Sequence, residues 1–208
     1  MERKSLCIAT RNANKVEEMT PFLSQFWDVK SALDYPEIPD VEETGTTFQA
    51  NADLKAIAIS AALPVVVLSD DSGLEVDVLE GAPGVYSARY AGPEKDDAAN
   101  NARLLEELAA LGAMTRGQRR ARFRCVLSLA KGGKVIQNFE GVCQGIIVKE
   151  PRGTAGFGYD PLFLPDGFDS TLAEMGMDRK NRISHRWRAL QAFYIWCKYR
   201  GSKLLSEA

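Results

Sequence analysis

The chain has 208 residues, of which 45% are hydrophobic and 26% are charged, and its formal net charge is −2. This composition is ordinary for a globular protein, and the length suits either one large domain over residues 1–208 or two closely associated lobes. The slight negative charge argues against non-specific nucleic-acid binding, because proteins attracted to a polyphosphate backbone carry a clear excess of lysine and arginine. The net charge still allows a small phosphate ligand to bind, because such a ligand needs only a local cluster of basic residues.

Neither the cysteines nor the apolar segments indicate secretion or membrane insertion. The four cysteines are scattered, form no CxxC pair and lie mostly among apolar residues, which is typical of reduced, buried thiols. No apolar segment of a secretory signal follows Met1, and the longest apolar stretch, residues 56–68, is interrupted by Ser60 and Pro64. That stretch is also shorter than the ~20 residues that a membrane-spanning helix needs. We therefore expect a cytoplasmic protein with no membrane partner.

The first half of the chain alternates short apolar segments with helical patterns. Apolar residues spaced three or four apart predict helices, while uninterrupted apolar runs before polar clusters predict buried strands. Pro21 lies inside the first helical pattern and weakens it, and Pro64 ends the second. In chain order we expect a strand over 5–10, a helix over 16–26, an acidic loop over 34–45, a helix over 46–62, a strand over 65–68 and a helix over 96–111.

The second half changes character. Residues 121–129 alternate apolar and polar side chains, which is the period of a half-buried strand. The Lys-Gly-Gly-Lys sequence at 131–134 predicts a hairpin turn into a second strand over 135–148. A loop rich in glycine and proline follows over 151–167, and a last helix begins near Ser184. Helices and strands that alternate first, followed by antiparallel strands, predict an α/β fold with a mixed sheet.

A polar cluster, Thr10 to Lys15, directly follows the first predicted strand. In α/β sheets ligands bind beyond the carboxyl ends of strands, where helix N-termini converge. The cluster offers a hydroxyl, amides, a lysine and a helix N-terminus, all of which suit phosphate oxygens. The alternative is ordinary helix capping by Asn12 or Asn14, with Lys15 in solvent. These residues by themselves favour the capping alternative.

Asp70-Asp71-Ser72-Gly73 follows the second predicted strand. Two adjacent carboxylates there repel each other and are costly to desolvate, and a magnesium ion would relieve that conflict. A turn in which one aspartate caps the backbone and the other faces water explains the pair equally well. Glu42-Glu43 in the acidic loop could add a metal ligand, although such a pair is more often solvated.

Two further segments could contact a nucleobase. Gly156 to Pro161 presents aromatic rings on a flexible loop, where a ring can stack on a base, although packing of the rings into the core is locally the better explanation. The basic stretch over 179–186 contains the chain's only histidine, His185, so a metal site with several histidines is excluded. No nucleophile elbow, P-loop or dinucleotide-binding motif accompanies these segments.

Seven segments, taken in order, resemble the inosine triphosphate pyrophosphatase family, which hydrolyses the triphosphates of non-standard purine nucleosides. Each match is weak by itself, but together they are specific and extend from residue 10 to residue 186. They are Thr10-Arg11-Asn12-Ala13-Asn14-Lys15, Glu42-Glu43-Thr44-Gly45, Asn51 to Lys55, Asp70 to Gly73, Gly81 to Gly84 with Ser87 to Tyr90, Gly156 to Pro161, and Ser184-His185-Arg186.

The resemblance implies an α/β fold with two lobes around a long central mixed β-sheet, flanking helices and a substrate cleft between the lobes. It also implies a homodimer that hydrolyses ITP, dITP and XTP to the monophosphate and pyrophosphate with Mg²⁺. The implied residues for catalysis and the metal are Asp71 as general base and metal ligand, Glu42 as second metal ligand, and Lys55 and Asp70 in support. The implied residues for the triphosphate are Thr10, Arg11, Asn12, Ala13, Asn14 and Lys15. The implied residues for the rest of the nucleotide are Ser72, Phe157, Gly158, Tyr159, Asp160, Lys180, His185 and Arg186.

Two residues depart from the family pattern. Arg11 is often smaller in relatives, and we expect it either to add a phosphate contact or to point to solvent. Trp187 is bulky for its place and is expected to narrow the base pocket. Two other functions stay open: a related pyrophosphatase acting on modified pyrimidine or standard nucleotides, and a nucleotide-binding protein without catalysis. The complete set of acidic residues and lysines argues against the second.

Overall fold

The computed structural model describes residues 3–201, and the chain divides into two compact units. The first unit comprises the residues up to 71, residues 125–141 and the residues from 186 onward. The second unit comprises residues 72–124 and 142–185. Each unit is therefore assembled from segments that are far apart in the sequence.

Six strands form a mixed sheet in the order β2-β1-β3-β4-β5-β6. β1 pairs in parallel with β2 and with β3, whereas β5 and β6 are antiparallel. This confirms the predicted α/β class with a mixed sheet. The strands are β1 Ser5–Ala9, β2 Asp28–Ser31, β3 Val66–Val76, β4 Arg120–Lys131, β5 Lys134–Ile147 and β6 Phe163–Pro165.

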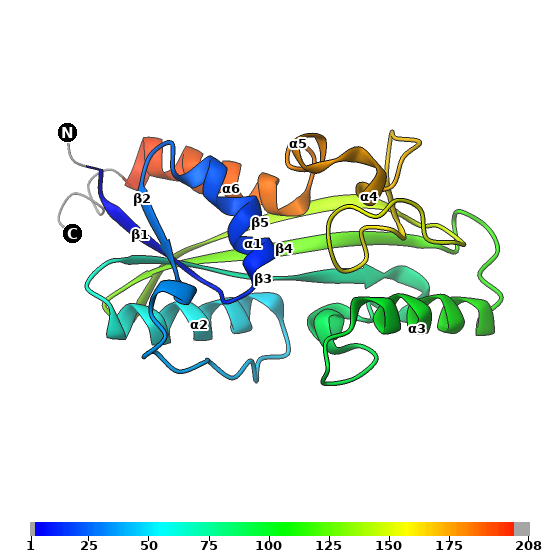
Figure 1. Ribbon diagram of the computed structural model, residues 1–208, viewed down its shortest axis with the longest axis horizontal. Helices are drawn as coiled ribbons and strands as arrows, with labels where there is room; N and C mark the ends of the chain where they lie inside the picture. The colour runs from blue at the N-terminus through cyan, green and yellow to red at the C-terminus, as the bar shows by residue number, and fades with distance from the viewer. Residues whose placement is uncertain (1–2, 202–208) are drawn as a thin grey trace. The chain divides into compact units, whose positions relative to one another are not determined.

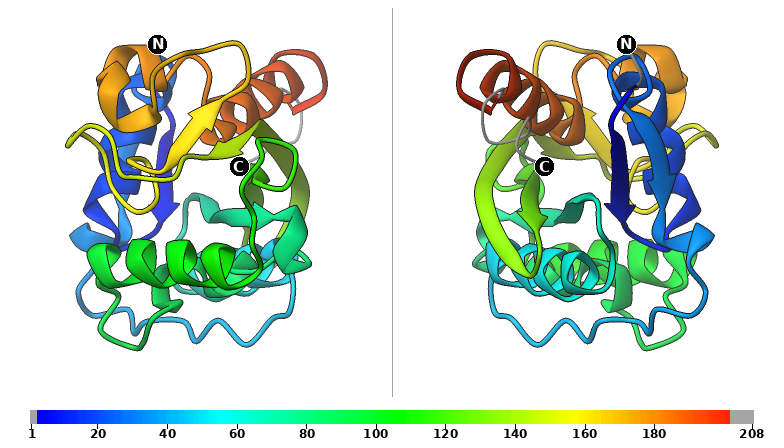
Figure 2. Two further views of the ribbon diagram at one scale, coloured as in Figure 1. Left: turned by 90° about the vertical axis from the view of Figure 1, so that its right-hand side faces the viewer. Right: turned by 90° about the vertical axis from the view of Figure 1, so that its left-hand side faces the viewer.

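In the first unit, helices cover both faces of the sheet (Figure 1). α2 (Phe48–Ala62) lies on one face, and α1 (Ala13–Leu23) and α6 (His185–Trp196) lie on the other, as the end-on views of Figure 2 also show for α2 and α6. Burial of each large apolar side chain between these layers contributes about 1.5–3 kcal/mol. The fully or almost fully buried side chains of this core include Leu6, Ile8, Met19, Leu23, Leu127 and Phe193.

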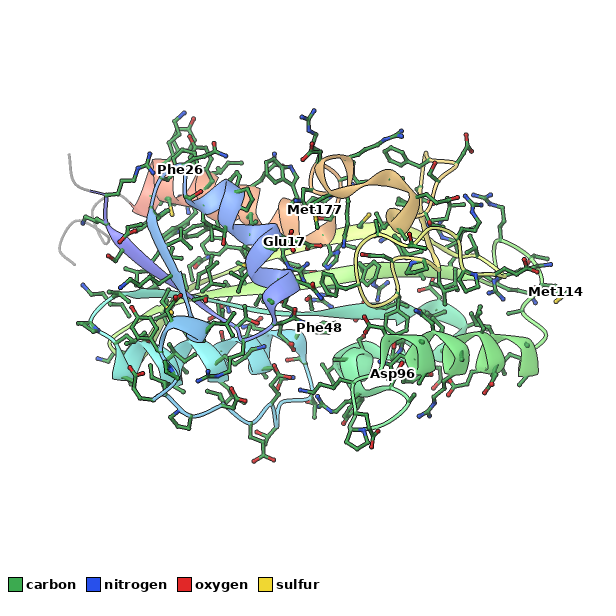
Figure 3. The ribbon with its side chains drawn as sticks, viewed as in Figure 1. Glu17, Phe26, Phe48, Asp96, Met114 and Met177 are labelled. Atoms are coloured by element: carbon green, nitrogen blue, oxygen red, sulfur yellow. The ribbon has the colours of Figure 1, made fainter. Side chains whose placement is uncertain are left out.

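In the second unit, the main helix is α3 (Asp97–Ala110), and its buried side chains Leu104 and Leu108 belong to an apolar core. Asp96, labelled in Figure 3, caps this helix by accepting a hydrogen bond from the Ala99 N–H at 2.9 Å. α4 (Leu172–Met175) and α5 (Met177–Lys180) are single turns. The core side chains include Leu74, Leu104, Leu108, Phe123, Tyr159 and Phe163.

The predicted hairpin between β4 and β5 is confirmed. Gly132 and Gly133 form its turn with φ of +56° and +76°. Two consecutive residues with positive φ are what a two-residue turn needs to follow the twist of its strands, and glycine adopts this conformation without steric cost.

The predicted end of the second apolar strand is wrong. We expected it to stop before Ser69, but β3 continues to Val76, so Asp70 and Asp71 lie inside a strand. Polar residues interrupt the apolar pattern without ending the strand, because cationic partners from distant segments neutralise the buried charge. The sequence also did not predict β2, β6, α4 or α5. Within residues 3–201, no helix is long and apolar enough to cross a membrane.

Candidate active site

The segment Thr10 to Lys15 joins the end of β1 to the first turn of α1. Asn12 caps the helix: its Oδ1 accepts from the Lys15 N–H at 3.2 Å, while Thr10 Oγ1 accepts from the Asn12 N–H at 3.2 Å. Asn12, Ala13 and Asn14 are exposed, so this N-terminus is accessible to a ligand. The Lys15 side chain does not point to solvent, because its ammonium lies 2.5 Å from Asp70 Oδ1. The predicted capping by Asn12 is therefore confirmed, whereas the prediction that Lys15 lies in solvent is wrong.

Asp70 is fully buried, and groups of the chain contact both its oxygens. Oδ1 pairs with Lys15, while Oδ2 lies 3.0 Å from Arg186 Nε and 3.1 Å from Cys125 Sγ. Burial by itself would raise the pKa of Asp70, but the Arg186 guanidinium and the Lys15 ammonium hold that pKa well below its ordinary value. Asp70 is therefore a charged carboxylate that organises cations.

Arg186 lies between two buried carboxylates. Its Nε contacts Asp70, its Nη1 forms an ion pair with Glu18, and the residue is 2% exposed. Burial alone would lower the pKa of Arg186, but Asp70 and Glu18 raise it. The guanidinium that was expected to reach the nucleotide is thus held inside the first unit by its own acidic partners.

Lys55 of α2 gathers a second acidic group. Its Nζ lies 2.5 Å from Glu43 Oε1, 2.7 Å from the Asp70 carbonyl oxygen and 3.4 Å from Asp71 Oδ1. Burial alone would lower the pKa of Lys55, but Asp71 and Glu43 raise it overall, so the ammonium stays charged. Lys55 therefore holds the two carboxylates close to each other.

Asp71 is 6% exposed, and its Oδ2 has no hydrogen-bond partner among residues 3–201. Burial is the main cause that raises its pKa; Lys55 and Lys15 oppose this effect, and Glu43 and Asp70 add to it. A buried carboxylate oxygen without a donor is costly, and a bound cation would remove that cost.

Glu43, which the sequence did not single out as a metal ligand, is the glutamate of the acidic loop that contacts Lys55. Glu42, the expected metal ligand, is exposed, whereas Glu43 is half-buried and contacts Lys55. Asn51 Oδ1 accepts from the Gly45 N–H at 2.7 Å and so ties the loop to α2. Asn51 and Lys55 are four residues apart and therefore share the helix face that meets this loop.

Within residues 3–201, no group of three or more histidine, cysteine or acidic side chains gathers as a ready-made metal site. Two carboxylates, those of Glu43 and Asp71, do meet at one ammonium. Mg²⁺ typically binds one or two protein carboxylates together with substrate phosphates, so this pair fits Mg²⁺ better than it fits a metal held by protein alone.

In the second unit, Phe157 to Asp160 form a loop whose polar groups are bound internally. Asp160 Oδ2 accepts from the Phe157 N–H at 3.0 Å and pairs with the buried Lys180 ammonium. That ammonium also lies 4.7 Å from the centroid of the Phe157 ring. Tyr159 is buried in the core and donates to the Ser87 carbonyl at 2.8 Å. Core packing thus explains Tyr159, whereas Phe157 is only half-buried.

Two further residues that were expected to bind the nucleotide, His185 and Ser72, lie in the second unit but outside this loop. The His185 ring stacks on Phe123, with centroids 4.7 Å apart and planes inclined by 12°. Ser72 is half-buried and follows Asp71 on β3. The expected site residues thus form a cationic and acidic cluster in the first unit and an aromatic loop with Lys180 in the second.

This arrangement of segments is that of a known protein family. The sequence model of the Ham1 family matches residues 6–196. The chain belongs to the Ham1 family. The match includes every segment on which the resemblance to the inosine triphosphate pyrophosphatases rested.

Ham1 relatives are similar over almost the whole chain. A dITP/XTP pyrophosphatase of Halalkalibacterium halodurans is 47% identical over 194 residues, covering 93% of this chain and 98% of that protein. One from Exiguobacterium sibiricum is 52% identical over 187 residues, covering 89% and 93%. The structure of the Staphylococcus aureus Ham1 protein has a TM-score of 0.83 at 39% identity, covering 94% of this chain and 98% of that one.

The two departures from the Ham1 pattern both have structural explanations. Arg11 is bound within the chain: it donates to the Tyr35 and Ile38 carbonyl oxygens and lies 2.6 Å from Asp40 Oδ1. Arg11 thereby ties the start of α1 to the acidic loop. The Trp187 ring packs edge-on against the Phe22 ring, with the ring centroids 4.9 Å apart. Trp187 therefore takes part in the packing of α6 against α1, and this contact does not support the expectation that it narrows the base pocket.

Proposed function

We propose that this Ham1-family protein is a nucleoside-triphosphate pyrophosphohydrolase that converts ITP, dITP and XTP to the monophosphate and pyrophosphate with the aid of Mg²⁺. The observation that carries the proposal is the buried Asp71 carboxylate, whose unpartnered Oδ2 lies in a cluster with Glu43 and Lys55. The similar proteins of Halalkalibacterium halodurans and Exiguobacterium sibiricum are named dITP/XTP pyrophosphatases, which supports the same reaction here.

The triphosphate binds at the start of α1 in this proposal. The exposed N-terminus of the helix offers backbone N–H groups and a positive dipole end, which together favour phosphate. Thr10 and Asn12 position that turn, and Lys15 and Lys55 supply positive charge. Phosphoryl-type displacement depends mainly on alignment and charge neutralisation, so these groups supply what the substrate requires.

Asp71 accepts the proton of the attacking water in this proposal. Burial raises its pKa toward the range in which a carboxylate is an effective general base. Glu43 and Asp71 would hold Mg²⁺, and Glu42, which is exposed, is the weaker candidate. When bound, Mg²⁺ neutralises phosphate charge beside these carboxylates. Asp70 contributes by keeping Lys15 and Arg186 in place.

Selectivity for the base comes from the second unit in this proposal. The Lys180 ammonium lies 4.7 Å from the centroid of the Phe157 ring, and the base stacks on this ring. Hydrogen-bond donors of the protein that pair with the 6-oxo group of hypoxanthine or xanthine would have no acceptor when adenine binds, because adenine carries an amino group there. Each such unpaired group costs about 1–3 kcal/mol, so a few contacts suffice for strong discrimination.

Release of pyrophosphate from a nucleotide panel tests the proposed reaction. With Mg²⁺, we expect rapid pyrophosphate release from ITP, dITP and XTP and much slower release from ATP, GTP, CTP and UTP. Rapid turnover of pyrimidine or standard nucleotides would instead favour the related pyrophosphatase. Tight binding of ITP without pyrophosphate release would show a nucleotide-binding protein that lacks catalysis.

A matched pair of glutamate variants tests the metal ligand. We expect Glu43→Gln to raise the Mg²⁺ concentration for half-maximal binding at least about tenfold, because one of two charged ligands is lost. Glu42→Gln should leave it unchanged, because Glu42 is exposed. Displacement of bound Mn²⁺ by Mg²⁺, followed by electron paramagnetic resonance with the product pyrophosphate in place of ITP, provides the measurement. An equal effect of the two variants, or a larger effect of Glu42→Gln, would contradict the assignment.

We also propose that the protein is a cytoplasmic homodimer whose small-molecule partner is the nucleoside triphosphate. Both features rest on the resemblance to the family and on the sequence composition.

A further inference from the structure

We propose that α3 positions the base-stacking loop of the second unit through a clamp on Gly158, formed by Asp97 and Asn101. The proposal rests on the proposed function, in which Phe157 stacks on the base. Neither side chain is assigned a contact with the nucleotide, so both are positioning residues.

The clamp binds both backbone polar groups of one residue. Asp97 Oδ2 accepts from the Gly158 N–H at 2.6 Å, and Asn101 Nδ2 donates to the Gly158 carbonyl oxygen at 3.0 Å. Asp97 and Asn101 are four residues apart and therefore lie on the same face of α3. One helix face thus holds the peptide planes on either side of Gly158.

Gly158 is a position where such a restraint has a large effect. Its φ is +62°, in the left-handed region, and no atom lies near where a Cβ would be. Glycine in an open position has wide backbone freedom, and rotation about Gly158 would reorient the preceding peptide and the Phe157 ring. The Phe157 N–H is already held by Asp160 at 3.0 Å, so the clamp restrains the other side of the stacking residue.

Two polar residues beside the clamp, Asp96 and Asn100, form hydrogen bonds to other parts of the chain, so the clamp is distinct from the cap of the helix. Asp96 caps the helix through the Ala99 N–H. Asn100 is buried, accepts from the Ala91 N–H at 2.7 Å and donates to the Ala88 carbonyl at 3.1 Å. The side-chain hydrogen bonds of Asp96 and Asn100 thus go to residues other than Gly158, so these two positions provide controls beside Asp97 and Asn101.

Steady-state kinetics of single variants test the clamp. We expect Asp97→Ala and Asn101→Ala each to raise KM for ITP about tenfold and to reduce the ratio of kcat/KM between ITP and ATP, with kcat within about twofold of wild type. Asp97→Asn should behave like wild type, because its amide oxygen can accept the same N–H. Asp96→Ala should lower the melting temperature through loss of the cap and leave KM unchanged.

Hydrogen exchange measures the clamp independently of activity. In Asp97→Ala and Asn101→Ala, the amides of residues 156–160 should exchange faster than in wild type, whereas Asp96→Ala should not change them. If wild type releases no pyrophosphate from ITP, the proposed function is overturned, and exchange still decides whether the clamp holds the loop. If wild type is active and the clamp variants keep its KM and selectivity, or if their exchange is unchanged, the clamp proposal is overturned.

Discussion

Replacing Asp71 with asparagine is expected to lower kcat for ITP by at least about 10³-fold. Loss of a general base by itself costs about 10²–10⁴-fold, and the same carboxylate is the proposed Mg²⁺ ligand. The variant should fold normally, because asparagine has the same shape and removes a buried charge that Glu43 and Asp70 repel. Pyrophosphate release measured at saturating ITP and Mg²⁺ gives the rate.

The melting temperature of Asp71→Asn supplies the control. Burial already raises the pKa of Asp71, so neutralising the group should leave the melting temperature equal to that of wild type or above it. A kcat within tenfold of wild type would show that the proton is accepted elsewhere. If kcat and the melting temperature of Asp71→Asn both fell strongly, Asp71 would instead have a structural role.

Replacing Arg186 with leucine is expected to give the largest loss of stability. The change leaves the buried carboxylates of Glu18 and Asp70 without their guanidinium partner. Breaking a buried ion pair by removing one member costs about 3–5 kcal/mol in the free energy of unfolding. For a chain of this size the melting temperature should fall by roughly 6–20 °C. Thermal and urea unfolding followed by circular dichroism measure both quantities.

Two variants separate this effect from general damage to α6. Arg188→Leu changes an exposed arginine on the same helix and should shift the melting temperature far less. Adding Glu18→Gln to Arg186→Leu should restore part of the lost stability, because one uncompensated buried charge disappears. If Arg186→Leu keeps its stability but raises KM for ITP, the guanidinium acts on the nucleotide, as the family resemblance implies.

Several parts of the fold followed from the sequence alone. The helix after β1, the alanine-rich α2 and the amphipathic α3 were visible because composition and apolar spacing are local features of the sequence. The turn at Gly132-Gly133 was visible because few residues other than glycine adopt two consecutive positive φ values. The family was also evident from the sequence, because its short motifs are stretches of contiguous residues.

Only the tertiary structure shows which charged and polar groups pair with one another. Arg186 meets Asp70 across 116 positions of sequence, and Asn101 meets Gly158 across 57. Periodicity and spacing report the local environment of a residue, so they cannot show which distant group neutralises a buried carboxylate. For that reason the sequence placed Asp70 at the end of a strand, and it did not show that Glu43 contacts Lys55 or that Arg186 pairs with Asp70 and Glu18. The apolar pattern determines which elements form, whereas the pairing of charges depends on contacts that exist only after the elements have packed.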